Sequence, residues 1–148
     1  MEQALEARTR APLHFWIVAG LSLLWNAFGA FDYTMTNLRD AAYLANFPPG
    51  MMDYIDAMPL WATAAWALGV WGAVAGSVLL LLRSRYAVAA FAVSLLGLAV
   101  STIHQWTMPQ RPEWMTDPMM LAMNGLIWVA AIFLLFYALA MHRRGVLK

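Results

Sequence analysis

Four polar side chains stand inside otherwise apolar segments, and they are the residues with which this chain could do chemistry. They are Asn26, Asp32, His104 and Asn124. An amide or an imidazole in hydrocarbon costs free energy unless it is hydrogen-bonded, so each of them needs a partner. Asp32 and His104 are expected at the same depth, where a carboxylate beside an imidazole could act as an acid–base couple or a pH switch.

These side chains allow three interpretations. In the first, Asn26, His104 and Asn124 bond to one another or to the backbone and lock the helices together. In the second, they line an outward-facing polar pocket that binds a small ligand and is closed by the loops above it. In the third, Asp32 and His104 are the catalytic groups of a membrane enzyme. The predicted lining residues of the pocket are Asn26, Asp32, Tyr33, Trp61, Trp66, His104 and Asn124.

Several other kinds of site lack their characteristic residues. Cysteine is absent, which excludes disulfides, thiol nucleophiles and thiolate metal sites. A metal site would need His104, Asp32 and a third ligand that the sequence does not offer. Scattered methionines without cysteine or clustered histidine are more typical of adaptable apolar packing than of soft-metal binding. We therefore expect neither a metal nor a cofactor.

The elements that must position these residues are membrane-spanning helices. The chain has 148 residues, of which 63% are apolar and 11% charged, whereas soluble domains carry about a quarter charged residues. Its apolar segments have the ~20 residues needed to cross ~30 Å of hydrocarbon. The sequence thus predicts an all-α, four-transmembrane-helix bundle in a single integral membrane domain. The expected spans are 14–31, 60–82, 86–104 and 119–141.

Basic residues are distributed unequally between the two ends of these spans. The N-terminal arm (1–13), the turn between the second and third spans, and the C-terminal tail (142–148) hold seven of the nine Lys and Arg residues. Only Arg39 and Arg111 fall in the other two loops, 32–59 and 105–118. Cytoplasmic loops carry the excess of positive charge, so both termini are expected in the cytoplasm. The net charge of +1 gives no reason to expect a nucleic-acid partner, and the expected partner is the lipid bilayer.

The outer loop 32–59 is too long for a simple turn and is predicted to cap the bundle. The run Asn37-Leu38-Arg39-Asp40 is typical of a helix start, and Pro48-Pro49-Gly50 stops the helical turn that follows. The stretch Met51–Met58 has an apolar face opposite two acidic residues. We expect two short amphipathic helices lying over the extracytoplasmic side.

Small residues form a stripe on the second and the third span. Small stripes let helices approach closely in lipid, and the short linker Arg83-Ser84-Arg85 forces these two spans into an antiparallel hairpin. Mutual packing of the stripes is one interpretation, and a homo-oligomer or larger membrane complex is the other. The stripes comprise Ala65, Gly69, Gly72 and Gly76 in the second span and Ala90, Ser94, Gly97 and Ser101 in the third; the oligomer contact would use Gly69, Gly72 and Gly76.

The first span also shares features with a signal peptide. Arg8 and Arg10 precede an apolar run that ends in Ala27-Phe28-Gly29-Ala30. The bulky Trp25 and Phe28 and the amide of Asn26 argue against cleavage there. The other three spans keep their predicted topology in either case.

The run LWNAFGAFDYTMTNLRDAAYLANFPP, followed by MPLWATAAWALGVWGAVAGSVLLLLRSR and FAVSLLGLAVSTIHQW, resembles a family of small bacterial four-helix inner-membrane proteins, some of which carry the label "sugar transporter". The resemblance covers roughly Leu13–Trp106 and implies an inner-membrane location, but it supplies no catalytic residues. Four helices offer no inverted-repeat architecture of a sugar carrier, so transport would require an oligomer. We expect a non-enzymatic accessory subunit or small-ligand-binding bundle, with an oligomeric transporter or channel as the alternative.

Overall fold

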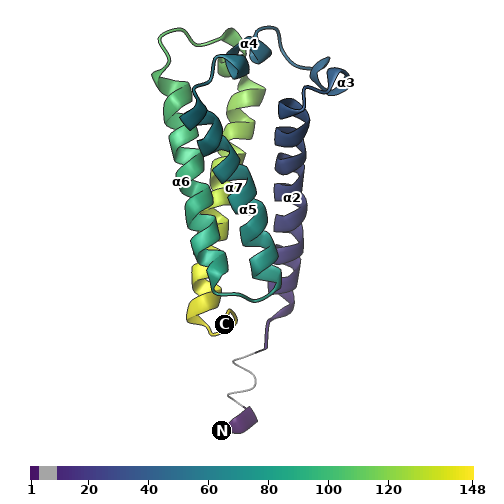
Figure 1. Cartoon of the computed structure of the whole chain (residues 1–148). Coiled ribbons are helices and arrows are strands. Elements are labelled where there is room, and N and C mark those ends of the chain that lie inside the picture. The colour runs from purple at the N-terminus through teal and green to yellow at the C-terminus, as the bar shows by residue number, and fades with distance from the viewer. Residues whose placement is uncertain (4–9) are drawn as a thin grey trace.

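The computed structural model describes residues 1–3 and 10–148, and every regular element in these ranges is helical (Figure 1). Four helices are long and apolar enough to cross a membrane, which confirms the predicted four-helix bundle. The predicted arm 1–13 falls largely on residues 4–9, outside the described residues. The elements are α2 (Leu13–Asn37), α3 (Ala41–Leu44), α4 (Met51–Asp56), α5 (Leu60–Leu81), α6 (Tyr86–Thr107), the 3-10 helix η1 (Glu113–Thr116) and α7 (Pro118–Arg143).

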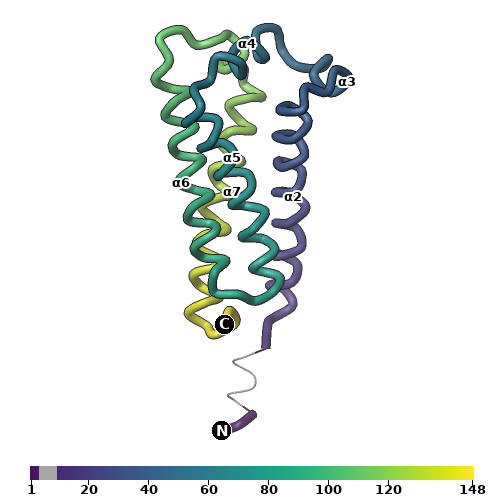
Figure 2. The backbone as a smooth tube through the Cα atoms, viewed as in Figure 1, coloured from purple at the N-terminus to yellow at the C-terminus, as the bar shows by residue number. Residues whose placement is uncertain are grey.

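The long helices pack in the order α2, α5, α6, α7. The path of the chain shows α5 and α6 as an antiparallel hairpin joined by a short turn, at the same end as the start of α2 and the C-terminus (Figure 2). At least one side-chain hydrogen bond crosses each neighbouring pair, so polar contacts as well as packing hold the helices together in an apolar medium. These bonds run from Asn26 Nδ2 to Ser77 Oγ (2.8 Å), from Ser94 Oγ to the Gly69 carbonyl (2.6 Å) and from Trp128 Nε1 to Thr102 Oγ1 (3.2 Å).

Glycines set the close contact between α5 and α6. A Cβ atom added to Gly72 would lie 3.2 Å from Ser94 Cα, and one added to Gly76 would lie 2.7 Å from the ring of Phe91. A Cβ atom on Gly97 would lie 2.6 Å from the Ala65 carbonyl oxygen. The two small-residue stripes therefore face each other within one chain, and α6 covers the face of α5 that carries the glycines.

Helix α2 extends beyond the span predicted for it. It continues to Asn37, whereas the sequence analysis ended the span at residue 31. Neither proline nor glycine interrupts the chain between these points, and Thr34 Oγ1 bonds to the Ala30 carbonyl at 2.7 Å, within the helix. The 25 residues reach about 37 Å, more than ~30 Å of hydrocarbon. Asp32 and Thr36 consequently stand on helical turns near one end of the bundle.

At the end of the bundle opposite the α5–α6 turn, α4 lies over the long helices and α3 lies at the edge, beside the end of α2 (Figure 1). Two short helices at this end were predicted from the sequence. Asp40 begins α3 by accepting a hydrogen bond from the Tyr43 backbone N–H at 2.8 Å. Gly50 precedes α4 with a φ of 80°, a conformation that favours glycine. An ion pair between Arg39 and Asp56 links the two parts of the cap.

The packed core lies at the opposite end, around the start of α2 and the α5–α6 turn. It includes Phe15, Leu80 and Leu134, and the C-terminal residues Val146 and Leu147 are buried against them. The predicted tail 142–148 thus folds back under the bundle. Backbone hydrogen bonds hold it there, from Lys148 N–H to the Arg83 carbonyl (2.8 Å) and from Arg85 N–H to the Lys148 carbonyl (2.9 Å).

Candidate functional site

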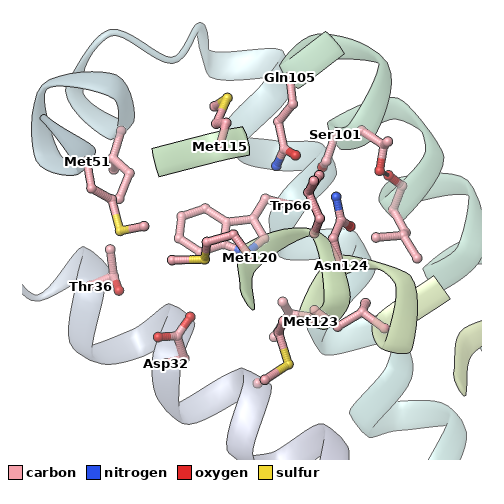
Figure 3. Close-up of a pocket in the computed structure, with 18 of the residues that line it drawn as sticks. Asp32, Thr36, Met51, Trp66, Ser101, Gln105, Met115, Met120, Met123 and Asn124 are labelled. Atoms are coloured by element: carbon pink, nitrogen blue, oxygen red, sulfur yellow. Dashed lines mark hydrogen bonds between the residues drawn. The ribbon is translucent and has the colours of Figure 1, made fainter. Parts of the chain in front are cut away.

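A cavity of about 700 Å³ lies between the four long helices and under the cap. Small-molecule sites in proteins have volumes of this order, roughly 300–1,000 Å³. Side chains from α2, α5, α6 and α7 line it, with Trp66 near its middle (Figure 3). Met51, Ile55 and Met58 of the cap and Met115 of η1 close its outer end.

The cavity is long and narrow. Its lining runs along α6 from Phe91 to Trp106 and along α7 from Met119 to Leu134. Fifteen helical steps correspond to about 22 Å, so the volume is spread over a narrow cross-section. Phe91 and Leu134 also belong to the packed core, which therefore forms the floor of the cavity.

The side of the cavity between α2 and α7 is open. These helices are joined near the inner end, where His14 Nδ1 lies 2.7 Å from the Tyr137 hydroxyl. Nearer the cap, no hydrogen bond joins them in the part of the chain that the structure describes. Phe28 of α2 and Ile127 of α7 both line the cavity, yet 66% and 38% of their surfaces are exposed. In a membrane this opening faces lipid.

The polar residues deepest in the cavity wall already have partners. Asn26 donates to Ser77 and to the Ala73 carbonyl, and Ser94 donates to the Gly69 carbonyl. Because these groups are bonded to neighbouring helices, they hold the wall together. They leave the deep part of the cavity effectively apolar.

Three polar groups near the cap differ, because they are buried without a hydrogen-bond partner among the described residues. They are the hydroxyls of Thr36 and Ser101 and the indole N–H of Trp114. All three residues line the cavity, and Thr36 and Ser101 are only 2% and 9% exposed. A buried polar group without a partner costs ~1–3 kcal/mol, and native proteins contain few of them. The three atoms have almost no accessible surface, so a molecule bound in the cavity would bond to them only after the side chains that cover them had moved.

Amide groups surround the same end of the cavity. Asn124 of α7 and Gln105 of α6 flank Ser101 (Figure 3). Asp32 and Thr36 lie across the cavity on α2, and Met120 and Met123 extend into the space between. This end of the cavity therefore combines hydrogen-bonding groups, the carboxylate of Asp32 among them, with flexible apolar side chains that can adapt to a ligand.

Asp32 is engaged with the cap. Its carboxylate accepts a hydrogen bond from the Tyr43 hydroxyl at 2.5 Å. Burial, this hydrogen bond and the charge of Asp32 together raise the pKa of Tyr43 to about 12. Tyr43 therefore stays a neutral donor, and the bond fastens α3 to the end of α2 beside the cavity.

His104 has different neighbours. Its Nδ1 lies 3.4 Å from the Tyr54 hydroxyl, and its ring meets the Trp61 ring edge-on at 5.3 Å. Burial of Tyr54 raises the pKa of its hydroxyl. Asp32 and His104 thus bind separate partners in the cap, and the structure does not bring them together as an acid–base couple.

Four of the predicted pocket residues line the cavity, namely Asn26, Asp32, Trp66 and Asn124. The other three lie outside its lining. Tyr33 packs edge-on against Trp66 with ring centroids 4.8 Å apart, while Trp61 and His104 contact each other.

Sequence reasoning missed the unpartnered groups. Ser101 was assigned to a small-residue packing stripe and not to the predicted pocket, and Thr36 lay beyond the predicted end of its span. A helical hydroxyl commonly bonds to its own backbone, as Thr102 does with the Leu98 carbonyl at 2.8 Å. The sequence carries no signal that separates Thr36 and Ser101 from this ordinary case.

No cluster of three or more His, Asp or Glu side chains suited to a metal ion occurs within residues 1–3 and 10–148. Comparisons with protein-family models, with curated proteins and with solved structures find no match to this chain. The function must therefore be argued from the site itself.

Proposed function

We propose that this chain is a multi-pass protein of the bacterial inner membrane that binds a small molecule in the cavity under its cap and catalyses no reaction. The observation that carries this proposal is the set of three buried, unpartnered polar groups on Thr36, Ser101 and Trp114, all in the wall of one cavity. A bound molecule with hydrogen-bonding atoms would relieve their desolvation cost once it had displaced the side chains that cover them, and the flexible methionines of the lining allow such movement.

The same geometry favours binding over the two alternatives. The packed core below Phe91 and Leu134 interrupts the cavity before it reaches the other side, and a transporter needs a path across the membrane. An enzyme would need reactive groups in contact with the ligand, whereas Asp32 is engaged with Tyr43 and His104 lies outside the lining.

The proposed orientation places the cap outside and the tail in the cytoplasm. The excess of Lys and Arg at the α5–α6 turn and the chain ends supports this orientation. The resemblance noted above supports the location in the inner membrane. Because the chain has no cysteine, single cysteines can report the orientation. On intact cells with a permeabilised outer membrane, Gln110→Cys should react with a membrane-impermeant maleimide. His142→Cys should react only after the inner membrane is broken, and the reverse pattern would refute this orientation.

The binding proposal is tested by purifying the protein in mild detergent and identifying what copurifies by native mass spectrometry. Wild type should carry a small molecule. Ser101→Leu removes the hydroxyl and fills part of the cavity. Its affinity for the molecule should fall at least about tenfold, which corresponds to ~1.4 kcal/mol of binding free energy. Thr107→Leu is the matched control, because Thr107 is exposed on the same helix and bonds to its own backbone. Equal occupancy in all three proteins, or none in wild type, would contradict the proposal.

A further inference from the structure

We propose that the ligand of this cavity is an uncharged single-chain lipid, such as a monoacylglycerol, with its head under the cap and its chain between α2 and α7. This inference rests on the proposed binding function and specifies the chemistry of its ligand. It draws on the shape of the cavity, the position of its polar groups, its opening and its charge.

The shape of the cavity fits an extended chain. A volume of about 700 Å³ spread over about 22 Å of helix suits a long, thin molecule better than a compact one. Apart from polar groups that are bonded to neighbouring helices, the deeper part of the lining is apolar, with Val70, Leu98, Ala131 and Leu134 among its side chains. An alkyl chain in this space would make van der Waals contacts with protein atoms along most of its length, and such packing favours association within an apolar medium.

The unsatisfied polar groups all lie at one end. The polar groups farther in, Asn26 and Ser94, bond to neighbouring helices, whereas Thr36, Ser101 and Trp114 near the cap have no partner in the described part of the chain. A ligand that is polar at one end and apolar along the rest of its length matches this distribution. A uniformly polar molecule would place hydroxyls against the apolar floor without partners.

The opening gives such a molecule a path from the membrane. The seam between α2 and α7 is closed at the inner end by His14 and Tyr137, and nearer the cap it is bordered by the exposed Phe28 and Ile127. The opening therefore faces the hydrocarbon layer, where a lipid already resides. A water-soluble molecule would have to pass the cap instead.

The charges argue for an uncharged head. The unpartnered groups are two hydroxyls, which can donate and accept, and one indole N–H, which only donates. They match hydroxyl and ester oxygens. A phosphate would demand basic partners, and among the described residues Arg111 is the one Lys or Arg in the lining. Its guanidinium lies over the Trp106 ring, 4.8 Å from the centroid. Asp32 would repel an anion placed beside it.

The test uses the purified wild-type protein in detergent and three probes, which are a monoacylglycerol, phosphatidylglycerol and free glycerol. Native mass spectrometry should show retention of the monoacylglycerol and little of the other two. Thr36→Val and Ser101→Ala, which each remove one hydroxyl, should weaken its binding about threefold to tenfold, and Thr107→Val, which removes a hydroxyl outside the cavity, should not.

A photoactivatable group in the acyl chain locates the bound molecule. Labelling that is suppressed by an excess of unlabelled monoacylglycerol should map to residues 25–29 of α2 and 123–134 of α7. Suppressible labelling confined to other surfaces would overturn the proposal. So would preferential retention of phosphatidylglycerol, or binding of glycerol alone, although either would leave a small-molecule binding function intact. Binding of none of the probes, with no copurifying molecule, would refute both proposals.

Discussion

Asn26 and Ser101 are polar side chains in comparable apolar surroundings, yet they have different roles. Asn26 donates to Ser77 Oγ at 2.8 Å and to the Ala73 carbonyl at 3.3 Å, and Ser77 also accepts from Ser22 at 3.1 Å. This network joins α2 to α5. Ser101 has no such partner among the described residues. The first residue therefore serves the fold, whereas the hydroxyl of the second makes no contact of this kind in the described part of the chain.

Removing the amide of Asn26 should weaken the contact between α2 and α5. We expect Asn26→Ala to lower the free energy of unfolding by ~0.5–2 kcal/mol, the range for hydrogen bonds between membrane helices. Reversible unfolding in mixed detergent micelles measures this loss. A double-mutant cycle with Ser77→Ala isolates the bond between the two side chains, because their individual effects should not add. Additive effects would mean that this bond contributes nothing.

The sequence predicted the depth of these side chains but not their direction. Counting residues along a span gives depth, so a concentration of polar groups in one half of the bundle was predictable. Direction depends on how each helix is rotated against its neighbours. In addition, the first span was predicted to end at residue 31, whereas α2 continues to Asn37. For these reasons Tyr33, Trp61 and His104 were assigned to a pocket that they do not line, and Thr36 was missed.

At the scale of the elements, the α5–α6 hairpin is the most closely packed pair. Gly97 is its tightest point, because an added Cβ atom would lie 2.6 Å from both the Ala65 carbonyl oxygen and the Gly69 backbone nitrogen. Backbone atoms cannot rotate away as a side chain can. The hairpin carries part of the cavity wall, including Trp66 and Ser101, so its spacing also sets the width of the cavity.

Gly97→Ala should therefore force the two helices apart. We expect a loss of ~1–3 kcal/mol in the free energy of unfolding, typical of overpacking a close contact. Gly125→Ala on α7 is the matched control, because nothing lies within 4 Å of the added atom, and it should cause no loss. If both variants unfold alike in mixed micelles, the close approach of α5 and α6 is not under steric control at Gly97.

The elements themselves were largely predictable, because their causes are local. Apolar length gave the four spans, and Pro48-Pro49-Gly50 separated the two cap helices. The helix order was predictable only for the hairpin, where a short linker leaves no choice. Helix α7 packs against α6 and leaves its side toward α2 open. This placement depends on tertiary contacts that no local sequence pattern encodes. The burial of Val146 and Leu147 was missed for the same reason.

The two ends of the whole molecule differ in packing. At the end with the α5–α6 turn, all four helices and the C-terminal tail meet around Phe15, Leu80 and Met141. At the other end the helices diverge around the cavity, and the cap is held by contacts such as Asp32–Tyr43 and Arg39–Asp56. The ion pair is solvent-exposed and contributes little, ~0–1 kcal/mol. Stability should therefore reside mainly at the packed end, which leaves the other end free to adapt to a ligand.

This division predicts that stability and binding can be changed separately. Leu147→Ala removes a side chain that is only 3% exposed in the core, and it should lower the free energy of unfolding by ~2–5 kcal/mol. Leu82→Ala, at the same end but 71% exposed, should cost far less. Under conditions where Leu147→Ala remains folded, it should hold the cavity ligand as wild type does, whereas Ser101→Ala should weaken binding with little loss of stability. Loss of ligand in folded Leu147→Ala would show that the two ends act as one unit.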